Sequence, residues 1–463
     1  MNPIFTPDPS SIPGSVSDSH SPSRLVLRGA TVVTMNSARE VAPLDVVVHN
    51  GRIEALHPPH TPAPPDSTIL DLRGCVLTPG LIQTHVHLCQ TLFRNLADDL
   101  ALLDWLKQRI WPLEAAHNPE SLYLSAMVGT SELLRGGTTT ILDMGTVFHH
   151  DAVMQAICDS GIRAFSGKTM MDAPDTHPGL AETAEMSLKE SCALFDKYHG
   201  AMGGRVNVVF APRFVLSCTD GLLRELAAEA NRRGAKVHTH ASENREEIAE
   251  VFRRTGKRNI VHLRDVGLVG PHVLCAHGVW LDQDEIAILA ETGTHILHCP
   301  SSNLKLGSGF CNVVGLRNAG VSVTLGADGA PCNNNMSALM EMRLCALLQK
   351  PIHGPQAMTA EQTFAMATCD GAKALGLEQE IGSIEVGKRA DITVLNLNRL
   401  HTGPGESTIY GRIVYGARDE EVTLVMVDGH ILVQNGQLVR VQTHELLHNA
   451  KGALDSLCAR AAI

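Results

Sequence analysis

Eight short apolar runs, separated by segments with helical periodicity, lie between residues 79 and 328 of this 463-residue chain. They occupy residues 79–87, 138–143, 163–168, 206–213, 237–243, 273–277, 294–298 and 321–328. Strands that alternate with helices eight times over about 250 residues predict an α/β fold, a (β/α)8 TIM barrel. An open doubly wound sheet is the alternative, but no glycine-rich phosphate loop follows the first run.

Both ends of the chain carry a different pattern, in which apolar and polar residues alternate as in half-buried strands. Each end also has a hairpin signal, Asn50-Gly51 in the first and Asp428-Gly429 in the second. We expect the two ends to pair into one small composite β-sandwich beside the barrel. The predicted boundaries are residues 1–23 for a disordered tail, 24–78 with 385–440 for the β-sandwich domain, 79–384 for the barrel and 441–463 for a C-terminal helix.

Composition narrows the classes of partner. A formal net charge of −11 argues against nucleic acid or an anionic membrane as a partner. The chain contains no run of about 18 apolar residues, so we expect no membrane span. We also expect no signal peptide, because the N-terminus lacks the basic and apolar regions that define one. The 12 cysteines are scattered without a C-x-x-C pair, which is typical of reduced thiols in a cytoplasmic enzyme. We expect a small-molecule substrate and a homo-oligomer.

Histidines and a carboxylate stand at the ends of several apolar runs, where a barrel of this kind places its active site. His85 and His87 are two residues apart, so both side chains lie on one face of a strand and can reach one metal ion. His240 and Asp328 end two later runs. Three imidazoles and one carboxylate suit a divalent transition metal. We predict one divalent metal, zinc ahead of iron, on His85, His87, His240 and Asp328.

Motifs spread along the chain identify a family. They lie at residues 79–87, 239–244, 276–277, 298–304, 325–329 and 382–391, within a matching region from Leu25 to about Val433. In these motifs the chain resembles the amidohydrolase superfamily, specifically its aminopurine deaminase branch. The resemblance implies metal-dependent hydrolytic removal of an amino group from a purine, with release of ammonia. A triazine-type chlorohydrolase on the same scaffold is a further alternative.

Two sets of motifs within this branch indicate different purines. Residues 325–350 and the segment that ends at Glu114 resemble 5′-methylthioadenosine/S-adenosylhomocysteine deaminase and 5′-deoxyadenosine deaminase. The resemblance implies that Glu114 holds the ribose hydroxyls. Gln90, Arg213 and Phe214 instead resemble guanine deaminase, where the matching residues hold the base. We favour a 5′-modified adenosine because its motifs are longer, and we keep guanine as the alternative.

The remaining polar residues at the strand ends are candidates for moving protons. Glu243 can protonate the ring nitrogen, contact the substrate and pass a proton to the leaving ammonia. His277 would orient the attacking hydroxide, and Asp328 could take its proton. The sequence leaves open whether Lys168 or His298 also lines the site. Barrels of this superfamily that became metal-free assembly proteins are a third class, but every ligand is retained here.

Overall fold

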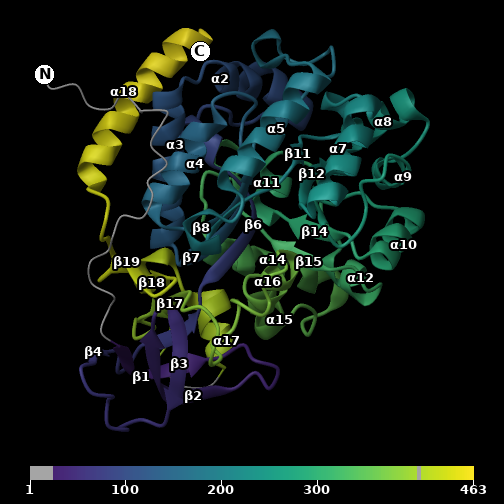
Figure 1. The fold of residues 1–463 in the computed structure, drawn as a ribbon. Coiled ribbons are helices and arrows are strands. Elements are labelled where there is room, and N and C mark those ends of the chain that lie inside the picture. The colour runs from purple at the N-terminus through teal and green to yellow at the C-terminus, as the bar shows by residue number, and fades with distance from the viewer. Residues whose placement is uncertain (1–23, 404–407) are drawn as a thin grey trace, which may run out of the picture.

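The computed structural model describes residues 24–403 and 408–463, so the predicted tail of residues 1–23 lies outside the described residues. Figure 1 shows a barrel surrounded by helices and, at one end of it, a smaller sheet. Purple N-terminal strands and yellow-green strands from near the C-terminus lie side by side in that sheet.

Eight parallel strands form the barrel, and each matches one of the apolar runs predicted from the sequence, with β7 extending one residue beyond its run. They are β6 (Leu81–His87), β7 (Thr138–Met144), β8 (Arg163–Gly167), β10 (Val206–Val208), β12 (Val237–Ala241), β13 (Val273–His277), β14 (His295–His298) and β15 (Val323–Leu325). Hydrogen bonding follows the order β10-β8-β7-β6 and the order β12-β13-β14-β15. The (β/α)8 prediction is confirmed.

Two joints close the ring of strands. A parallel bridge between Phe210 and Val237 joins the end of β10 to β12. On the other side, the Thr84 hydroxyl in β6 donates a hydrogen bond to the carbonyl oxygen of Leu325 in β15, at 3.0 Å. Just beyond β15, the short strand β16 (Asp328–Gly329) also pairs with β6 in parallel. The carboxyl ends of the parallel strands therefore lie together at one end of the barrel.

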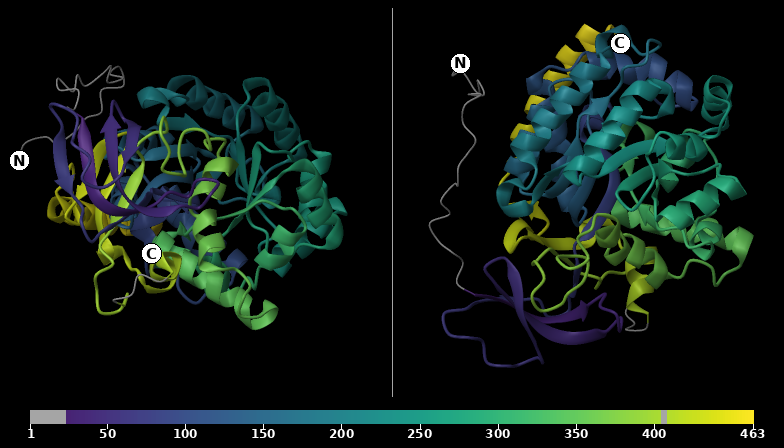
Figure 2. Two further views of the ribbon diagram at one scale, coloured as in Figure 1. Left: turned by 90° about the horizontal axis from the view of Figure 1, so that it is seen from below. Right: turned by 45° about the vertical axis from the view of Figure 1, so that its right-hand side comes forward.

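Helices surround the barrel in both views of Figure 2. The longer ones are α3 (Pro119–Arg135), α4 (His150–Ser160), α5 (Ala184–Tyr198), α7 (Asp220–Arg233), α8 (Arg245–Thr255), α9 (Asn259–Asp265), α10 (Gln283–Thr292), α11 (Pro300–Lys305), α12 (Val313–Asn318), α14 (Ala338–His353), α15 (Ala360–Met366), α16 (Cys369–Ala374) and α18 (Thr443–Ala461). The short ones are α1 (Leu102–Trp105), α2 (Trp111–Ala115), α6 (Ala201–Gly204), α13 (Ala330–Asn333) and α17 (Ile409–Gly411).

Capping residues explain where these helices begin and end. At α8 the Asn244 side chain accepts a hydrogen bond from the Glu246 backbone, and at α10 the Asp282 side chain accepts one from Glu285. Gly256, at φ +71°, ends α8 in the left-handed region that favours glycine. None of the helices within the described ranges combines the length and apolar character needed to cross a bilayer.

Both ends of the chain build the smaller sheet, which has nine strands. They are β1 (Leu25–Val33), β2 (Val41–His49), β3 (Arg52–His57), β4 (Thr68–Asp71), β5 (Val76–Pro79), β17 (Ile392–Leu395), β18 (Val422–Val427), β19 (His430–Gln434) and β20 (Gln437–Leu438). The two halves meet where β5 pairs with β1 on one side and with β17 on the other. The predicted hairpin turns at Asn50-Gly51 and Asp428-Gly429 are confirmed. For the described residues we propose the boundaries predicted from the sequence: 24–78 with 385–440 for the smaller domain, 79–384 for the barrel and 441–463 for the C-terminal helix.

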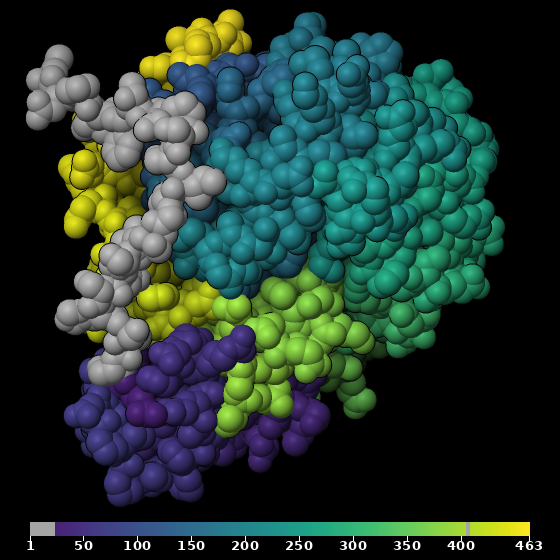
Figure 3. Space-filling model, viewed as in Figure 1, coloured from purple at the N-terminus to yellow at the C-terminus, as the bar shows by residue number. Residues whose placement is uncertain are grey.

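The space-filling view shows the same joining of distant segments at the surface. In Figure 3 the purple N-terminal residues abut yellow-green residues from late in the chain. At the opposite, C-terminal end, α18 lies along α3 of the barrel. The last part of the chain therefore contacts both the smaller sheet and the barrel.

A buried ion pair fastens the smaller sheet to the barrel. Arg163, the first residue of β8, contacts Asp391 twice, at 2.7 and 3.0 Å, and Asp428 at 2.6 Å. The Arg163 side chain is 2% exposed and that of Asp391 is 1% exposed. Asp391 immediately precedes β17, and Asp428 lies in the turn between β18 and β19. One barrel residue thus pairs with two carboxylates of the sheet, one of which, Asp428, also pairs with Arg389.

Replacing Arg163 with Met should lower the free energy of unfolding by about 3–5 kcal/mol, because two carboxylates would lose a buried partner. The matched control is Arg24→Met, which breaks the bidentate pair with Glu54 at an exposed site, where both side chains are more than a third accessible. Breaking that pair should cost about 0–1 kcal/mol. Urea unfolding of the three proteins measures both values. Equal losses in the two variants would contradict a fastening role for Arg163.

Candidate metal centre

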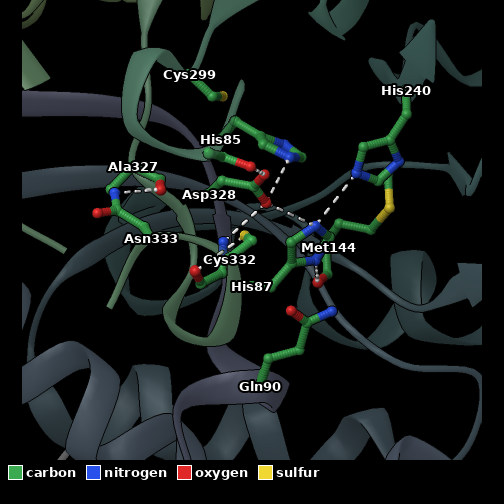
Figure 4. Close-up of polar contacts among 12 residues, drawn as sticks. His85, His87, Gln90, Met144, His240, Cys299, Ala327, Asp328, Cys332 and Asn333 are labelled. Atoms are coloured by element: carbon green, nitrogen blue, oxygen red, sulfur yellow. Dashed lines mark hydrogen bonds and ion pairs between the residues drawn. The ribbon is translucent and has the colours of Figure 1, made fainter. Parts of the chain in front are cut away.

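The four predicted metal ligands meet at the carboxyl ends of the barrel strands. His85 and His87 end β6, His240 lies in β12, and Asp328 opens β16. One potential ligand atom from each lies within 4.8 Å of those of the other three, and Figure 4 shows the four side chains pointing toward one another. His87 Nε2 is 3.2 Å from His240 Nε2. Asp328 Oδ1 is 3.3 Å from Nε2 of both His85 and His87.

Unusual backbone geometry places two of the side chains around this point. His277, which ends β13, has φ +76°, and Asp328 has φ +65°. Such left-handed conformations are unfavourable for residues other than glycine and are concentrated at functional sites. Gly326 allows the close approach of the last strand, because a Cβ atom there would lie 2.5 Å from the carbonyl oxygen of His85. The barrel therefore accepts strain where the candidate ligands converge.

Hydrogen bonds to backbone carbonyls orient two of the imidazoles. His87 Nδ1 lies 2.8 Å from the carbonyl oxygen of Met144, and His240 Nδ1 lies 2.7 Å from that of Arg213. Since a carbonyl oxygen only accepts, each Nδ1 holds the proton and each Nε2 keeps its lone pair. Burial lowers the pKa of His87 to about 4, so its ring is neutral near pH 7. Both Nε2 lone pairs point into the same space.

The donor set fits a divalent transition metal. His85 Nε2 is buried and makes no hydrogen bond among the described residues, although it faces Asp328 Oδ1. Two uncharged Nε2 atoms that face each other at 3.2 Å share no proton. Asp328 is a buried carboxylate beside these rings, and a buried carboxylate needs a positive partner. A cation among the four ligand atoms satisfies all of these groups.

The residues predicted to move protons lie beside this centre. His277 Nε2 is 3.4 Å from Glu243 Oε2 and 3.9 Å from Asp328 Oδ2. His277 Nδ1 donates to the side-chain oxygen of Asn303 at 2.9 Å, so in the neutral ring the Nε2 lone pair faces the site. Burial opposes a charged ring, but the neighbouring Glu243 and Asp328 carboxylates raise the pKa of His277 above its ordinary value. Burial raises the pKa of Glu243 above its ordinary value. The sequence analysis assigned no role to Asn303, which lies within one of its motifs.

A second group of potential ligands overlaps with the first. It consists of His277, Cys299 and Asp328, all buried, and it shares Asp328 with the main cluster.

Of the two residues left open by the sequence, Lys168 forms a buried ion pair with Glu182 at 2.5 Å, so its ammonium group is already neutralised. His298 is buried, and neither ring nitrogen has a hydrogen-bond partner in the described part of the chain.

The residues predicted for two different purines form one buried cluster. Arg213 contacts Glu114 through two nitrogens, at 2.7 and 3.2 Å, and Gln90 Nε2 donates to Glu114 Oε1 at 2.8 Å. The Glu114 side chain is fully buried and that of Arg213 is 4% exposed. Phe214, the next residue, packs in the hydrophobic core. A residue from the nucleoside motifs is thus neutralised by one from the guanine motifs.

The chain is similar to known proteins over most of its length. The profile of the amidohydrolase family matches residues 76–432. A 5′-deoxyadenosine deaminase from Methanobrevibacter smithii is 39% identical over 390 residues, which cover 84% of this chain and 88% of that protein. A 5-methylthioadenosine/S-adenosylhomocysteine deaminase from Symbiobacterium thermophilum is 38% identical over 438 residues, covering 93% of this chain and 98% of that protein.

A solved structure with bound zinc has the same fold. It is an adenosine deaminase from Xanthomonas campestris, with a TM-score of 0.89 and 32% sequence identity. The match covers 95% of this chain and 99% of that one. The similarity therefore includes both the barrel and the smaller sheet.

Replacing His87 or His240 with Ala should remove most of the bound metal, because each imidazole supplies one coordination bond. We expect about one metal per chain in the unaltered protein and a small fraction of that in either variant. Elemental analysis after gel filtration measures the content, and the exposed His149, replaced by Ala, is the control. Two tightly bound metals per chain at full activity would contradict the single-metal prediction.

Proposed function

Because this chain belongs to the amidohydrolase family, we propose that it is a metal-dependent hydrolytic deaminase that replaces the amino group of an aminopurine by oxygen and releases ammonia. The observation that carries the proposal is the convergence of three imidazoles, Asp328 and Glu243 at the carboxyl ends of the barrel strands. The reaction consumes one water molecule and yields one ammonia for each purine converted.

The proposed cofactor is one zinc ion held by His85, His87, His240 and Asp328. A divalent metal at this position lowers the pKa of water toward about 7 and so supplies a hydroxide nucleophile near neutral pH. Zinc is favoured over iron because a related structure contains zinc and because imidazole and carboxylate are ordinary zinc ligands. The ligands' own hydrogen bonds keep the rings in place before the metal arrives.

Three residues of the chain handle the protons of the reaction: Glu243 acts on the substrate, and His277 and Asp328 act on the attacking water. Glu243 donates a proton to the ring nitrogen next to the carbon that bears the amino group, and later supplies one to the departing ammonia. His277 accepts a hydrogen bond from the attacking water through Nε2, because its Nδ1 proton is engaged with Asn303. Asp328 accepts the proton that the water gives up. The proton that Glu243 passes to ammonia comes from the hydroxyl group newly bonded to the ring carbon, and the proton on Asp328 then restores the acid form of Glu243. Its Oδ2 is steadied by the Ser302 hydroxyl at 2.6 Å.

The proposed substrates are 5′-modified adenosines: 5′-deoxyadenosine, methylthioadenosine and S-adenosylhomocysteine. Relatives that carry these names are 38–39% identical to this chain over most of its length. In this proposal Glu114 accepts hydrogen bonds from the ribose hydroxyls. Arg213, Gln90 and Thr146 already donate four hydrogen bonds to this carboxylate, which offers about four acceptor positions. A ribose hydroxyl would therefore take the place of the longest of them, from the Thr146 hydroxyl at 3.4 Å.

Guanine is the second candidate substrate, and a specific contact favours it. Arg213 and Gln90 both contact Glu114 in the buried cluster, and Gln90 Oε1 has no partner among the described residues. That oxygen could accept a hydrogen bond from an N–H group on the edge of a base. Guanine deamination would then use Arg213 and Gln90 for recognition and leave Glu114 as their support.

The setting of the enzyme is also proposed. The 12 cysteines are all free thiols in the structure, which suits the reducing cytoplasm. The predicted homo-oligomer stays a prediction that light scattering on the purified protein can check.

Substituting Glu243 by Gln should slow turnover by roughly 10²–10⁴ while leaving the fold and metal content unchanged, because the amide cannot donate an acidic proton. The loss should appear in kcat rather than KM, since the proton moves only in the transition state. Steady-state ammonia release, with metal analysis of the same sample, makes the measurement. A kcat close to that of the unaltered enzyme would remove Glu243 from the mechanism.

Glu114→Ala should distinguish the two candidate substrates. Alone it is ambiguous, since it also leaves the buried Arg213 without its partner and lowers the folded fraction. The readout is therefore a ratio of kcat/KM values within each protein, for adenosine against an analogue without the 2′ and 3′ hydroxyls. The ratio should fall by an amount that corresponds to about 1.5–3 kcal/mol of transition-state stabilisation, as for hydrogen bonds to a charged group.

A ratio unchanged by Glu114→Ala, together with guanine turnover far above that of every adenosine derivative, would contradict the nucleoside assignment. Under guanine recognition, Arg213→Ala would be the more damaging variant. The ratio is insensitive to how much of each preparation is folded, because both substrates meet the same enzyme.

A further inference from the structure

A buried serine holds one oxygen of the Glu243 carboxyl group. Ser308 Oγ donates a hydrogen bond to Glu243 Oε1 at 3.2 Å, across a sequence separation of 65 residues. The other oxygen, Oε2, faces His277 Nε2 at 3.4 Å. Ser308 is 2% exposed. The two oxygens of this carboxyl therefore have different surroundings, one against a hydroxyl donor and one toward the reacting centre.

Trp280 braces both ends of this contact. Its indole Nε1 donates to the Ser308 carbonyl oxygen at 2.6 Å, and its backbone N–H donates to the Ser242 carbonyl oxygen at 3.0 Å. Ser242 directly precedes Glu243. Gly309, at φ +132°, lies against the indole, where a Cβ atom would come within 2.6 Å of the ring. One residue thus connects the turn of Glu243, through its backbone, with the loop of Ser308, through its side chain.

We propose that Ser308, braced by Trp280, is a positioning residue for Glu243 and directs the transferable proton of that carboxyl to Oε2. This inference rests on the proposed function, in which Glu243 moves protons to the purine and to ammonia. Nothing in the sequence analysis assigned a role to Ser308 or Trp280.

The chemistry follows from the inventory of donors and acceptors. A carboxyl oxygen that accepts a hydroxyl proton is a poor place for its own proton, so the proton of neutral Glu243 occupies the opposite oxygen. Without the Ser308 hydroxyl, either oxygen could hold the proton, and the group could turn away from the substrate. Misplacing a catalytic group lowers the rate even where binding is unchanged. The expected defect is therefore in kcat.

The test compares Ser308→Ala with the unaltered enzyme. Loss of one hydrogen bond to a carboxyl should reduce kcat on the order of tenfold, with KM and metal content unchanged. Ser308→Thr keeps a hydroxyl and should restore much of the rate. Ser187→Ala is the matched control, since Ser187 is buried in α5 and its hydroxyl has no partner among the described residues. It should leave kcat unchanged.

Trp280→Phe tests the brace independently, because it removes the Nε1–H donor but keeps an aromatic ring against Gly309 and under the Arg245 guanidinium. It should lower kcat in the same direction. The double variant with Ser308→Ala should lose less than the product of the two single losses, which is the signature of residues acting through one contact.

Two results would overturn the inference. One is an unchanged kcat in Ser308→Ala while Glu243→Gln is severely impaired, which would leave the proposed function intact. The other is a loss in Ser308→Ala that Ser308→Thr does not relieve and that a fall in unfolding temperature or metal content accounts for. A Glu243→Gln enzyme with full activity would instead reject the acid role itself, and the positioning of that acid with it.

Discussion

The buried carboxylate of Asp328 is the charge around which this site is organised. Its side chain faces the Nε2 atoms of His85 and His87. The Nδ1 atoms of His87 and His240 donate their protons to backbone carbonyls, so these two rings carry no proton on Nε2. An anion removed from water in this way is strongly unfavourable unless a cation joins it. The strained backbone at Asp328 and the glycine at position 326 both serve to bring this carboxylate against β6. The backbone conformation that ends the last strand therefore also places the carboxylate at the candidate metal site.

Arg213 links the candidate metal centre to the proposed substrate cluster. Its carbonyl oxygen accepts the Nδ1 proton of His240, while its guanidinium pairs with Glu114. The backbone of this residue thus orients a proposed metal ligand, while its side chain belongs to the proposed substrate cluster. Asp143 has a similar double position near β6, because it accepts the Leu88 backbone N–H immediately after His87 and also the Ser166 hydroxyl. Hydrogen bonds from the barrel therefore hold the proposed metal ligands and the backbone beside them in place.

The strand-end residues could be predicted from the sequence. The residues of the substrate cluster were named from a resemblance, but the contacts among Glu114, Arg213 and Gln90 could not be predicted. His85 and His87 follow from a period of two on a strand, and Asp328 follows from its place at the end of an apolar run. Glu114 lies in a five-residue helix with no periodic signal, and its partner Arg213 is 99 residues away. Ser308 had a local signal, since glycines with positive φ flank it. That signal predicts a turn but does not say which carboxyl the turn meets.

The central claim is that a metal at this site enables hydrolytic deamination of an aminopurine. The most direct measurement is ammonia release from 5′-deoxyadenosine by the purified protein, before chelation, after removal of metal, and after stepwise return of zinc. The account predicts that activity disappears with the metal and returns in proportion to added zinc, reaching its full value at about one equivalent. Undiminished ammonia release from metal-free protein would contradict it.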